Sequence, residues 1–301
     1  MRDLPSIVAG IAFSSIMWAL SVQAQAQSRV DENEVYGMVS GAALLMDVYY
    51  PDEPNQRGIL LVPGSGWNWP MGYSAGQIKE SPELSDSVSP LLDRGFTVFV
   101  ANYRLAPAFR YPAHIDDLRR AVRYIRANAS QFAIVPEPLG AYGISAGGNL
   151  VGLLALQDGI GQMGSDDPVE RQSAKVQAAV LRCTGQGLDL TAGYGPRENG
   201  PGVIASYLGE PMRMSGPRQP ISEKWIEASP LTYLSDDDPP VLMTNAMDDM
   251  VASYASAEAG AQALRTGGLD VEFIPRETGG HCRGDVPHER IAAWLVEKLV
   301  D

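Results

Sequence analysis

The sequence predicts an α/β fold in which a mostly parallel sheet is covered by helices on both faces. Segments with the composition of strands alternate with segments of helical periodicity along most of the chain. The strand segments are apolar along nearly their whole length, as strands buried on both faces are. Glycine or proline ends several of them.

The predicted strands begin with an alternating segment that ends at Pro51, followed by a continuous apolar run that ends in proline and glycine. In chain order the strand segments are 44–51, 58–67, 96–103, 138–145, 176–183, 240–246 and 271–276.

The predicted helices separate these strands. In the first, Ile115, Leu118 and Val122 recur at helical spacing, and in the last, Ile291 and Leu295 share one face. The helical segments are 114–129, 146–157, 253–268 and 287–299. The stretch from about 187 to 229, rich in Gly, Pro, Arg and Met, interrupts the alternation and is predicted to be a cap-like insertion over the sheet.

The first 26 residues are typical of a secretory signal peptide. An apolar run from Ile7 to Leu20 is too short to span a bilayer comfortably, and small residues at Ala24 and Ala26 follow at peptidase spacing. Residues 27–301 are then the mature domain, and the protein is expected to be secreted or periplasmic. The net charge of −13 disfavours binding to nucleic acid or to a membrane surface.

The stretch Gly143-Ile-Ser145-Ala-Gly147 has the G-x-S-x-G form between a predicted strand and a predicted helix. In that context a sharp turn lifts the serine hydroxyl above the sheet, and small neighbours are needed because the chain reverses there. The free N–H groups at the helix start point to the same place, so Ala146 N–H is a candidate oxyanion donor. A phosphate-binding loop would need a lysine and a spacing that this segment lacks.

A serine nucleophile needs a base and an acid that orients it. His281, in a glycine-flanked loop after the last strand, is the preferred base. We expect His114 to be a partly exposed capping residue and His288 to lie on the surface. Asp248 is preferred as the acid for its spacing before Val251, and the neighbouring Asp249 is the other candidate.

Together, the G-x-S-x-G segment, "VPGSGW", "NYRLAP" and "GGH" resemble the α/β-hydrolase family in this order and spacing. Within it they are similar to bacterial carboxylesterases related to hormone-sensitive lipase and to small acetyl-xylan and feruloyl esterases. The resemblance implies an eight-stranded, mostly parallel sheet with a small cap. It also implies Ser145 as nucleophile, Asp248 as acid, His281 as base, and neither a metal nor an organic cofactor.

The resemblance also implies that an oxyanion loop follows an early strand. Relatives carry His-Gly-Gly-Gly there, whereas this chain has Pro63-Gly64-Ser65-Gly66. Pro63 in place of histidine means that the loop must be held differently, and Ser65 in place of glycine makes a positive φ costlier. Ser65 and Gly66 are the expected donors. Trp67 and Trp69 follow directly and are candidate substrate contacts, with core packing as the alternative.

The two cysteines leave two readings open. Cys183 ends a predicted strand and Cys282 adjoins His281, so a disulfide between them would tether the histidine loop, and export would permit it. The other reading is two inert buried thiols. Neither cysteine has the partners or spacing of a zinc site.

The function predicted from these residues is hydrolysis of a carboxylic ester, with a small-molecule or polysaccharide-derived ester as substrate. A serine peptidase or amidase of the same fold would use the same triad, although the large extra domain usual in such peptidases is missing from this sequence. A non-catalytic binding protein is a third possibility, which the presence of all three triad residue types disfavours.

Overall fold

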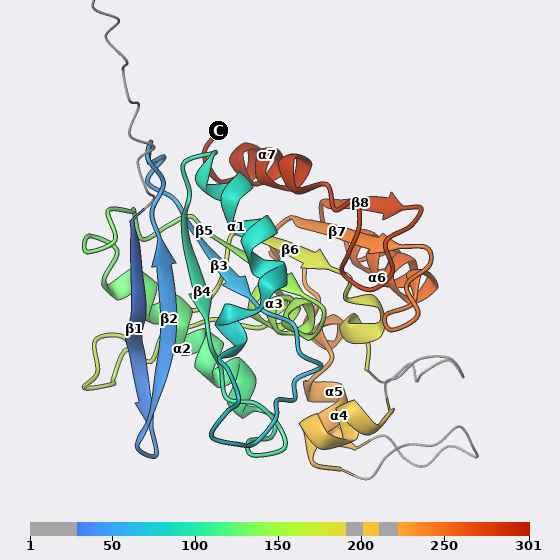
Figure 1. Ribbon diagram of the computed structural model, residues 1–301, viewed down its shortest axis with the longest axis horizontal. Coiled ribbons are helices and arrows are strands. Elements are labelled where there is room, and N and C mark those ends of the chain that lie inside the picture. Colours follow the sequence, from blue (N-terminus) through green and yellow to red (C-terminus); the bar gives the residue numbers. More distant parts are fainter. Residues whose placement is uncertain (1–28, 191–200, 211–221) are drawn as a thin grey trace, which may run out of the picture.

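The chain forms an eight-stranded sheet in the computed structural model, which describes residues 29–190, 201–210 and 222–301 (Figure 1). The strands are β1 (Val30–Val39), β2 (Ala42–Tyr49), β3 (Gly58–Val62), β4 (Thr97–Ala101), β5 (Leu139–Ile144), β6 (Ala178–Arg182), β7 (Val241–Ala246) and β8 (Val271–Arg276). Their spatial order is β1-β2-β4-β3-β5-β6-β7-β8. Strands β1, β2 and β4 pair antiparallel, and every pair from β4 to β8 is parallel. The predicted fold class is therefore confirmed.

Strand β1 was not predicted. It is an edge strand rich in charged residues, and it pairs with β2 through two register shifts that break the regular alternation of its side chains. Only Tyr36 of this strand is fully buried. A strand whose other side chains face solvent at least in part carries little of the apolar signal that identified the central strands.

Helices cover both faces of this sheet. They are α1 (Ser85–Leu92), α2 (Ala113–Ala127), α3 (Ala146–Leu156), α4 (Pro201–Leu208), α5 (Glu223–Glu227), α6 (Tyr254–Thr266) and α7 (His288–Leu299). Short 3₁₀ turns are η1 (Ile78–Glu80), η2 (Pro82–Leu84), η3 (Gly185–Leu188) and η4 (Pro230–Tyr233). The four predicted helices correspond to α2, α3, α6 and α7. Helix α1 was missed, because Ser and Pro interrupt its short apolar stripe.

Two apolar layers hold the sheet between the helices, and strand β3 shows how. Its alternate residues Leu60 and Val62 pack in the layer that includes α2, α3 and α6. Ile59 and Leu61 point the other way, into the layer that includes α1 and α7. Side chains alternate between the faces of a strand, so a strand buried on both sides must be apolar throughout.

The insertion is described only in part. Helices α4 and α5 lie together at one side of the molecule (Figure 1), and the Lys224 ammonium donates to the carbonyl of Leu208 at 3.2 Å. Residues 191–200 and 211–221 of the predicted cap lie outside the described residues, as does the predicted signal peptide, 1–26. Within the described ranges, no helix is long and apolar enough to cross a membrane.

Candidate active site

Ser145 lies at a sharp turn between β5 and α3, with φ 54° and ψ −119°. A non-glycine residue in this region costs about 1–3 kcal/mol and persists only where its surroundings impose it. The surroundings are crowded backbone. A Cβ on Gly143 would lie 2.2 Å from the Gly147 carbonyl oxygen, and a Cβ on Gly147 would lie 2.3 Å from that of Val62. The turn therefore needs glycine two residues before and two residues after the serine.

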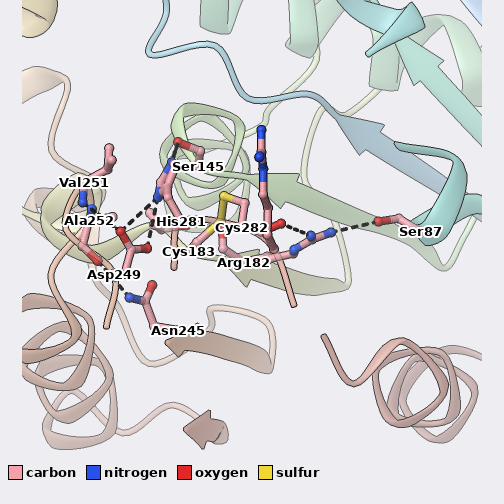
Figure 2. The surroundings of a disulfide bond; sticks show 12 residues. Ser87, Ser145, Arg182, Cys183, Asn245, Asp249, Val251, Ala252, His281 and Cys282 are labelled. Carbon is pink, nitrogen blue, oxygen red and sulfur yellow. Dashed lines mark hydrogen bonds and ion pairs between the residues drawn. A yellow bond between two sulfur atoms is a disulfide. The ribbon is translucent and has the colours of Figure 1, made fainter. Parts of the chain in front are cut away.

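The serine hydroxyl lies beside the imidazole of His281, which is on the loop after β8 (Figure 2). Ser145 Oγ and His281 Nε2 are 2.8 Å apart. His281 Nδ1 lies 3.0 Å from Oδ2 of Asp249 and 3.2 Å from its Oδ1. A carboxylate only accepts, so Nδ1 carries a proton and Nε2 of the neutral ring is free to accept from the serine. A hydroxyl, an imidazole and a carboxylate thus lie in series, in the order that a serine nucleophile with a base and an orienting acid requires.

The carboxylate beside His281 is that of Asp249 and not that of Asp248, which corrects the position predicted from sequence. The side chain of Asp249 is fully buried, and its Oδ1 also accepts from the backbone N–H groups of Val251 and Ala252, each at 2.8 Å. Asp248 is exposed and turned outward. It accepts from the N–H groups of Gly279 and Gly280, at 3.3 and 2.8 Å, and so supports the loop that leads to His281.

The loop after β3 lies against the serine turn. A Cβ on Gly64 would lie 2.8 Å from that of Ser145, so the two backbones are in direct contact. Positive φ values occur at Gly66 and Trp67, 62° and 59°, whereas Ser65 has none. The strain expected at Ser65 is therefore located two residues later, at the tryptophan. Ala146 is the first residue of α3, and its N–H has no acceptor within the helix.

A cavity of about 350 Å³ opens beside Ser145. Its walls come from the loop after β3, from α4, from the turn after Asp249 and from the histidine loop; the lining side chains include Ser65, Trp67, Val203, Ile204, Val251 and Arg283. Trp69 does not line the cavity, contrary to the prediction. It packs against the core, and its indole N–H donates to the Gly76 carbonyl at 2.7 Å.

Cys183 and Cys282 form a disulfide, with their Cα atoms 5.5 Å apart (Figure 2). Of the two alternatives that the sequence left open, the structure therefore supports the disulfide and not two free thiols. The disulfide joins the residue after β6 to the neighbour of His281. The two sulfurs and the His281 ring also form a group with the spacing of metal ligands, but sulfur atoms bonded to each other offer no thiolate.

Arg182, the last residue of β6, adds a second connection to the histidine loop. Its buried guanidinium donates to the carbonyl of Cys282 and, at 3.1 Å, to the hydroxyl of Ser87. Its own carbonyl accepts from the N–H of Ser145 at 2.8 Å. Serine and histidine are thus both held to the carboxyl end of β6. Sequence reasoning missed this residue because a lone arginine at a strand end has no distinctive pattern.

The other two histidines differ from expectation. His114 is completely buried near the start of α2, and Nε2 lies 3.1 Å from the Trp67 carbonyl oxygen. Burial lowers its pKa to about 4. His288 is half-buried at the start of α7, and burial likewise lowers its pKa to about 4. Neither imidazole reaches the serine. His114 was missed because nothing in its sequence neighbourhood indicates that Trp67 is its partner.

Comparison with known proteins agrees with this architecture. The family model described as BD-FAE matches residues 46–264. The probable carboxylic ester hydrolase LipM of Mycobacterium tuberculosis is 29% identical over 68% of this chain and 44% of its own length. Esterase LipQ of the same organism is 25% identical over 87% of this chain and 59% of its own. The chain thus spans about half the length of these curated relatives.

A solved structure extends the comparison to three dimensions. The bifunctional GH43-CE protein of Bacteroides eggerthii superposes with a TM-score of 0.72 at 25% identity, covering 89% of this chain and 38% of that one. With the family match over most of its length, the chain belongs to the BD-FAE family and has the α/β-hydrolase fold.

Proposed function

We propose that this chain is a serine carboxylic-ester hydrolase that acts through an acyl-enzyme. The observation that carries the proposal is the unbroken series from Ser145 Oγ to His281 Nε2, 2.8 Å, and from His281 Nδ1 to Asp249, 3.0 Å. The esterase names of LipM and LipQ support the same reaction class.

In the proposed first half-reaction, Ser145 Oγ attacks the ester carbonyl carbon while His281 Nε2 takes the hydroxyl proton. The carbonyl electron pair moves onto oxygen, and backbone N–H groups of Ser65, Gly66 and Ala146 receive the resulting charge. One such donor typically lowers the barrier by about 3–4 kcal/mol. As the C–O bond breaks, the imidazolium returns its proton to the departing alcohol.

Water completes the cycle. His281 takes a proton from the water that attacks the acyl-enzyme, and the collapse of the second tetrahedral intermediate restores the Ser145 hydroxyl and releases the acid. Asp249 accepts from His281 Nδ1–H throughout and stabilises the imidazolium in both halves. Its full burial strengthens this interaction, because no water screens the carboxylate.

The proposed substrates are short-acyl esters, including acylated glycans and small aromatic esters. A cavity of about 350 Å³ is near the lower end of the range for ligand sites, which suits a short acyl group. Val203, Ile204 and Val251 supply apolar wall for such a group, and Trp67 adds an aromatic side chain to the lining.

The test is the Ser145→Ala variant. We expect loss of nearly all hydrolysis of p-nitrophenyl acetate with an unchanged circular dichroism spectrum, and loss of labelling by a fluorophosphonate. Parallel assays with the matching anilide measure ester against amide preference. Ester turnover by Ser145→Ala at the wild-type rate would refute the proposal.

We further propose that the protein is exported, as the segment 1–26 and the disulfide between Cys183 and Cys282 both suggest. Expression of the full chain in a bacterium should then give a periplasmic or secreted product whose N-terminus follows Ala24 or Ala26. A cytoplasmic product that keeps Met1 would contradict this.

A further inference from the structure

The loop after β3 carries a residue in an unfavourable conformation. Trp67 has φ 59°, which a bulky side chain rarely adopts, and it directly follows the proposed oxyanion donors Ser65 and Gly66. Such a conformation is stable only if contacts on the side chain and on the backbone impose it. The groups that contact Trp67 therefore hold the proposed oxyanion loop in place.

The side chain of Trp67 is held from two directions. Its indole N–H donates to Oδ1 of the buried Asn149 at 3.1 Å. Its ring stacks on Tyr207 of α4, with centroids 4.8 Å apart and an interplanar angle of 12°. These contacts fix the ring, but they leave the peptide that follows Trp67 to be fixed by other groups.

The carbonyl of that peptide accepts two hydrogen bonds. One comes from the Ala106 N–H at 2.9 Å and the other from His114 Nε2 at 3.1 Å. A carbonyl oxygen can only accept, so Nε2 carries the proton of the neutral ring. Nδ1 is buried and has no hydrogen-bond partner among the described residues, so no contact there favours the tautomer that is protonated on Nδ1.

The His114 ring is itself fixed by packing. It is completely buried, and its ring and that of Tyr207 pack in a T-shaped arrangement, at 90° with centroids 4.7 Å apart. The Tyr103 ring lies at 6.0 Å, and the Tyr103 hydroxyl donates to the Pro63 carbonyl at 2.9 Å. Both ends of the loop are thus held by side chains from outside it.

We propose that His114 is the positioning residue of the oxyanion loop, holding the strained Trp67 peptide through its Nε2–H. It acts from α2, on a loop that has Pro63 where the family resemblance implies a histidine. This role rests on the proposed esterase function, since it matters only if the loop N–H groups receive an oxyanion. His114 is buried and is not among the residues that line the cavity beside Ser145, so its proposed role is to position the loop and not to act on substrate.

The test separates the hydrogen bond from the packing. His114→Phe keeps an aromatic ring and loses the donor, whereas His114→Gln keeps a donor near the same place. Tyr207→Phe is the matched control, because the Tyr207 hydroxyl is buried without a partner among the described residues and the stack on Trp67 remains. The readouts are kcat, KM and the affinity for a short-chain trifluoromethyl ketone, whose adduct with Ser145 carries an oxyanion.

For His114→Phe we expect kcat and ketone affinity to fall together by about 10- to 100-fold with KM within about threefold, because the loss is confined to the charged intermediate. His114→Gln should recover most of both. Tyr207→Phe should stay within about threefold of wild type in both. Equal losses in His114→Phe and Tyr207→Phe, or no recovery in His114→Gln, would reduce His114 to a packing residue.

A second measurement needs no activity and no variant. The chain has three histidines, so ¹⁵N-histidine labelling gives few signals, and two-bond ¹H–¹⁵N correlations report the tautomer of each. We expect His114 to be neutral at pH 7 with the proton on Nε2. A proton on Nδ1 would overturn the proposal even in an active enzyme. Absence of ester hydrolysis and of fluorophosphonate labelling in the wild type would instead overturn the proposed function, and with it the role of His114.

Discussion

Two neighbouring carboxylates after β7 have different positions and different partners. Asp249 is buried and faces the imidazole, whereas Asp248 is exposed and accepts from the backbone of the loop before His281. The difference arises from the turn. The N–H of Asp249 donates to the Ala246 carbonyl at 3.2 Å, and Asp249 Oδ1 accepts from the N–H groups two and three residues later. These bonds turn one carboxylate inward and leave its neighbour in solvent.

Replacing each aspartate by asparagine should separate the two roles. We expect Asp249→Asn to lower kcat by about four orders of magnitude, because the amide cannot stabilise the imidazolium. Asp248→Asn should lower kcat less than about tenfold, since an amide oxygen can still accept from the Gly280 N–H. The measurement is kcat for a p-nitrophenyl ester across pH 6–9. A larger loss in Asp248→Asn would restore the acid predicted from sequence.

The limit of sequence reasoning at this scale is a shift by one residue. The position of a loop after a strand shows which acidic residues can reach the histidine. It does not show which one faces it, because the side chains of adjacent residues point in roughly opposite directions. The backbone hydrogen bonds that select the direction are not visible in residue types. Ser145 and His281 were easier to locate because glycines flank both of them.

At the scale of elements, the disulfide and Arg182 make the end of β6 the support of the histidine loop. The bridge spans 99 residues of sequence, and Arg182 donates to the carbonyl of Cys282. The loop itself has few regular backbone hydrogen bonds between Thr278 and Val286. These two connections therefore help to fix the position of His281, together with the contacts that Asp248, Asp249 and Arg276 make with the loop.

The double variant Cys183→Ser, Cys282→Ser should lose about 2–5 kcal/mol of unfolding free energy, the usual range for removing a native disulfide that closes a long loop. It should also lose activity under conditions where it remains folded, because His281 is less confined. Urea unfolding and kcat measure the two effects. Thiol titration of the denatured, unreduced wild type should find no free thiol, and two free thiols would exclude the bridge.

The elements that could be predicted are those whose apolar pattern is set by burial. The predicted segment 240–246 corresponds to β7, Val241–Ala246, and 146–157 corresponds to α3, Ala146–Leu156. Strand β1 and helix α1 were missed because partial solvent exposure and internal Ser and Pro weaken the pattern. The segment 58–67 was predicted too long, since β3 ends at Val62 and the proposed oxyanion loop begins there.

At the scale of the whole molecule, the candidate site is assembled from loops at one edge of the sheet. Ser145 follows β5, Asp249 follows β7 and His281 follows β8, and the cavity wall includes residues of α4 from the insertion. Parallel strands place their carboxyl ends together, so residues more than a hundred positions apart meet without any local signal. Contacts such as that of His114 with Trp67 depend on this convergence and could not be predicted.

Stability should fall in mild acid because of His114. Its pKa is about 4 in the folded chain, lowered first by burial and further by the nearby Arg104 charge, against an ordinary value of 6.5. The unfolded chain therefore binds a proton between pH 6.5 and 4 that the folded chain does not bind, and the unfolding free energy drops as pH falls through this window. The shift corresponds to a loss of about 3 kcal/mol, complete near pH 4.

His114→Gln isolates this contribution, because glutamine does not titrate while the carboxylates and His288 titrate alike in both proteins. At pH 7.5 the wild type should be the more stable of the two, since it keeps the native imidazole in its packed site. Its advantage should shrink steadily as the pH is lowered to 4.5, as measured by urea unfolding at each pH. An advantage that stays constant over the window would mean that the His114 ring is protonated as readily in the folded chain as in the unfolded one. The hydrogen bond to Trp67 would survive that result, because the protonated ring also donates from Nε2, but the lowered pKa of the buried His114 ring would be refuted.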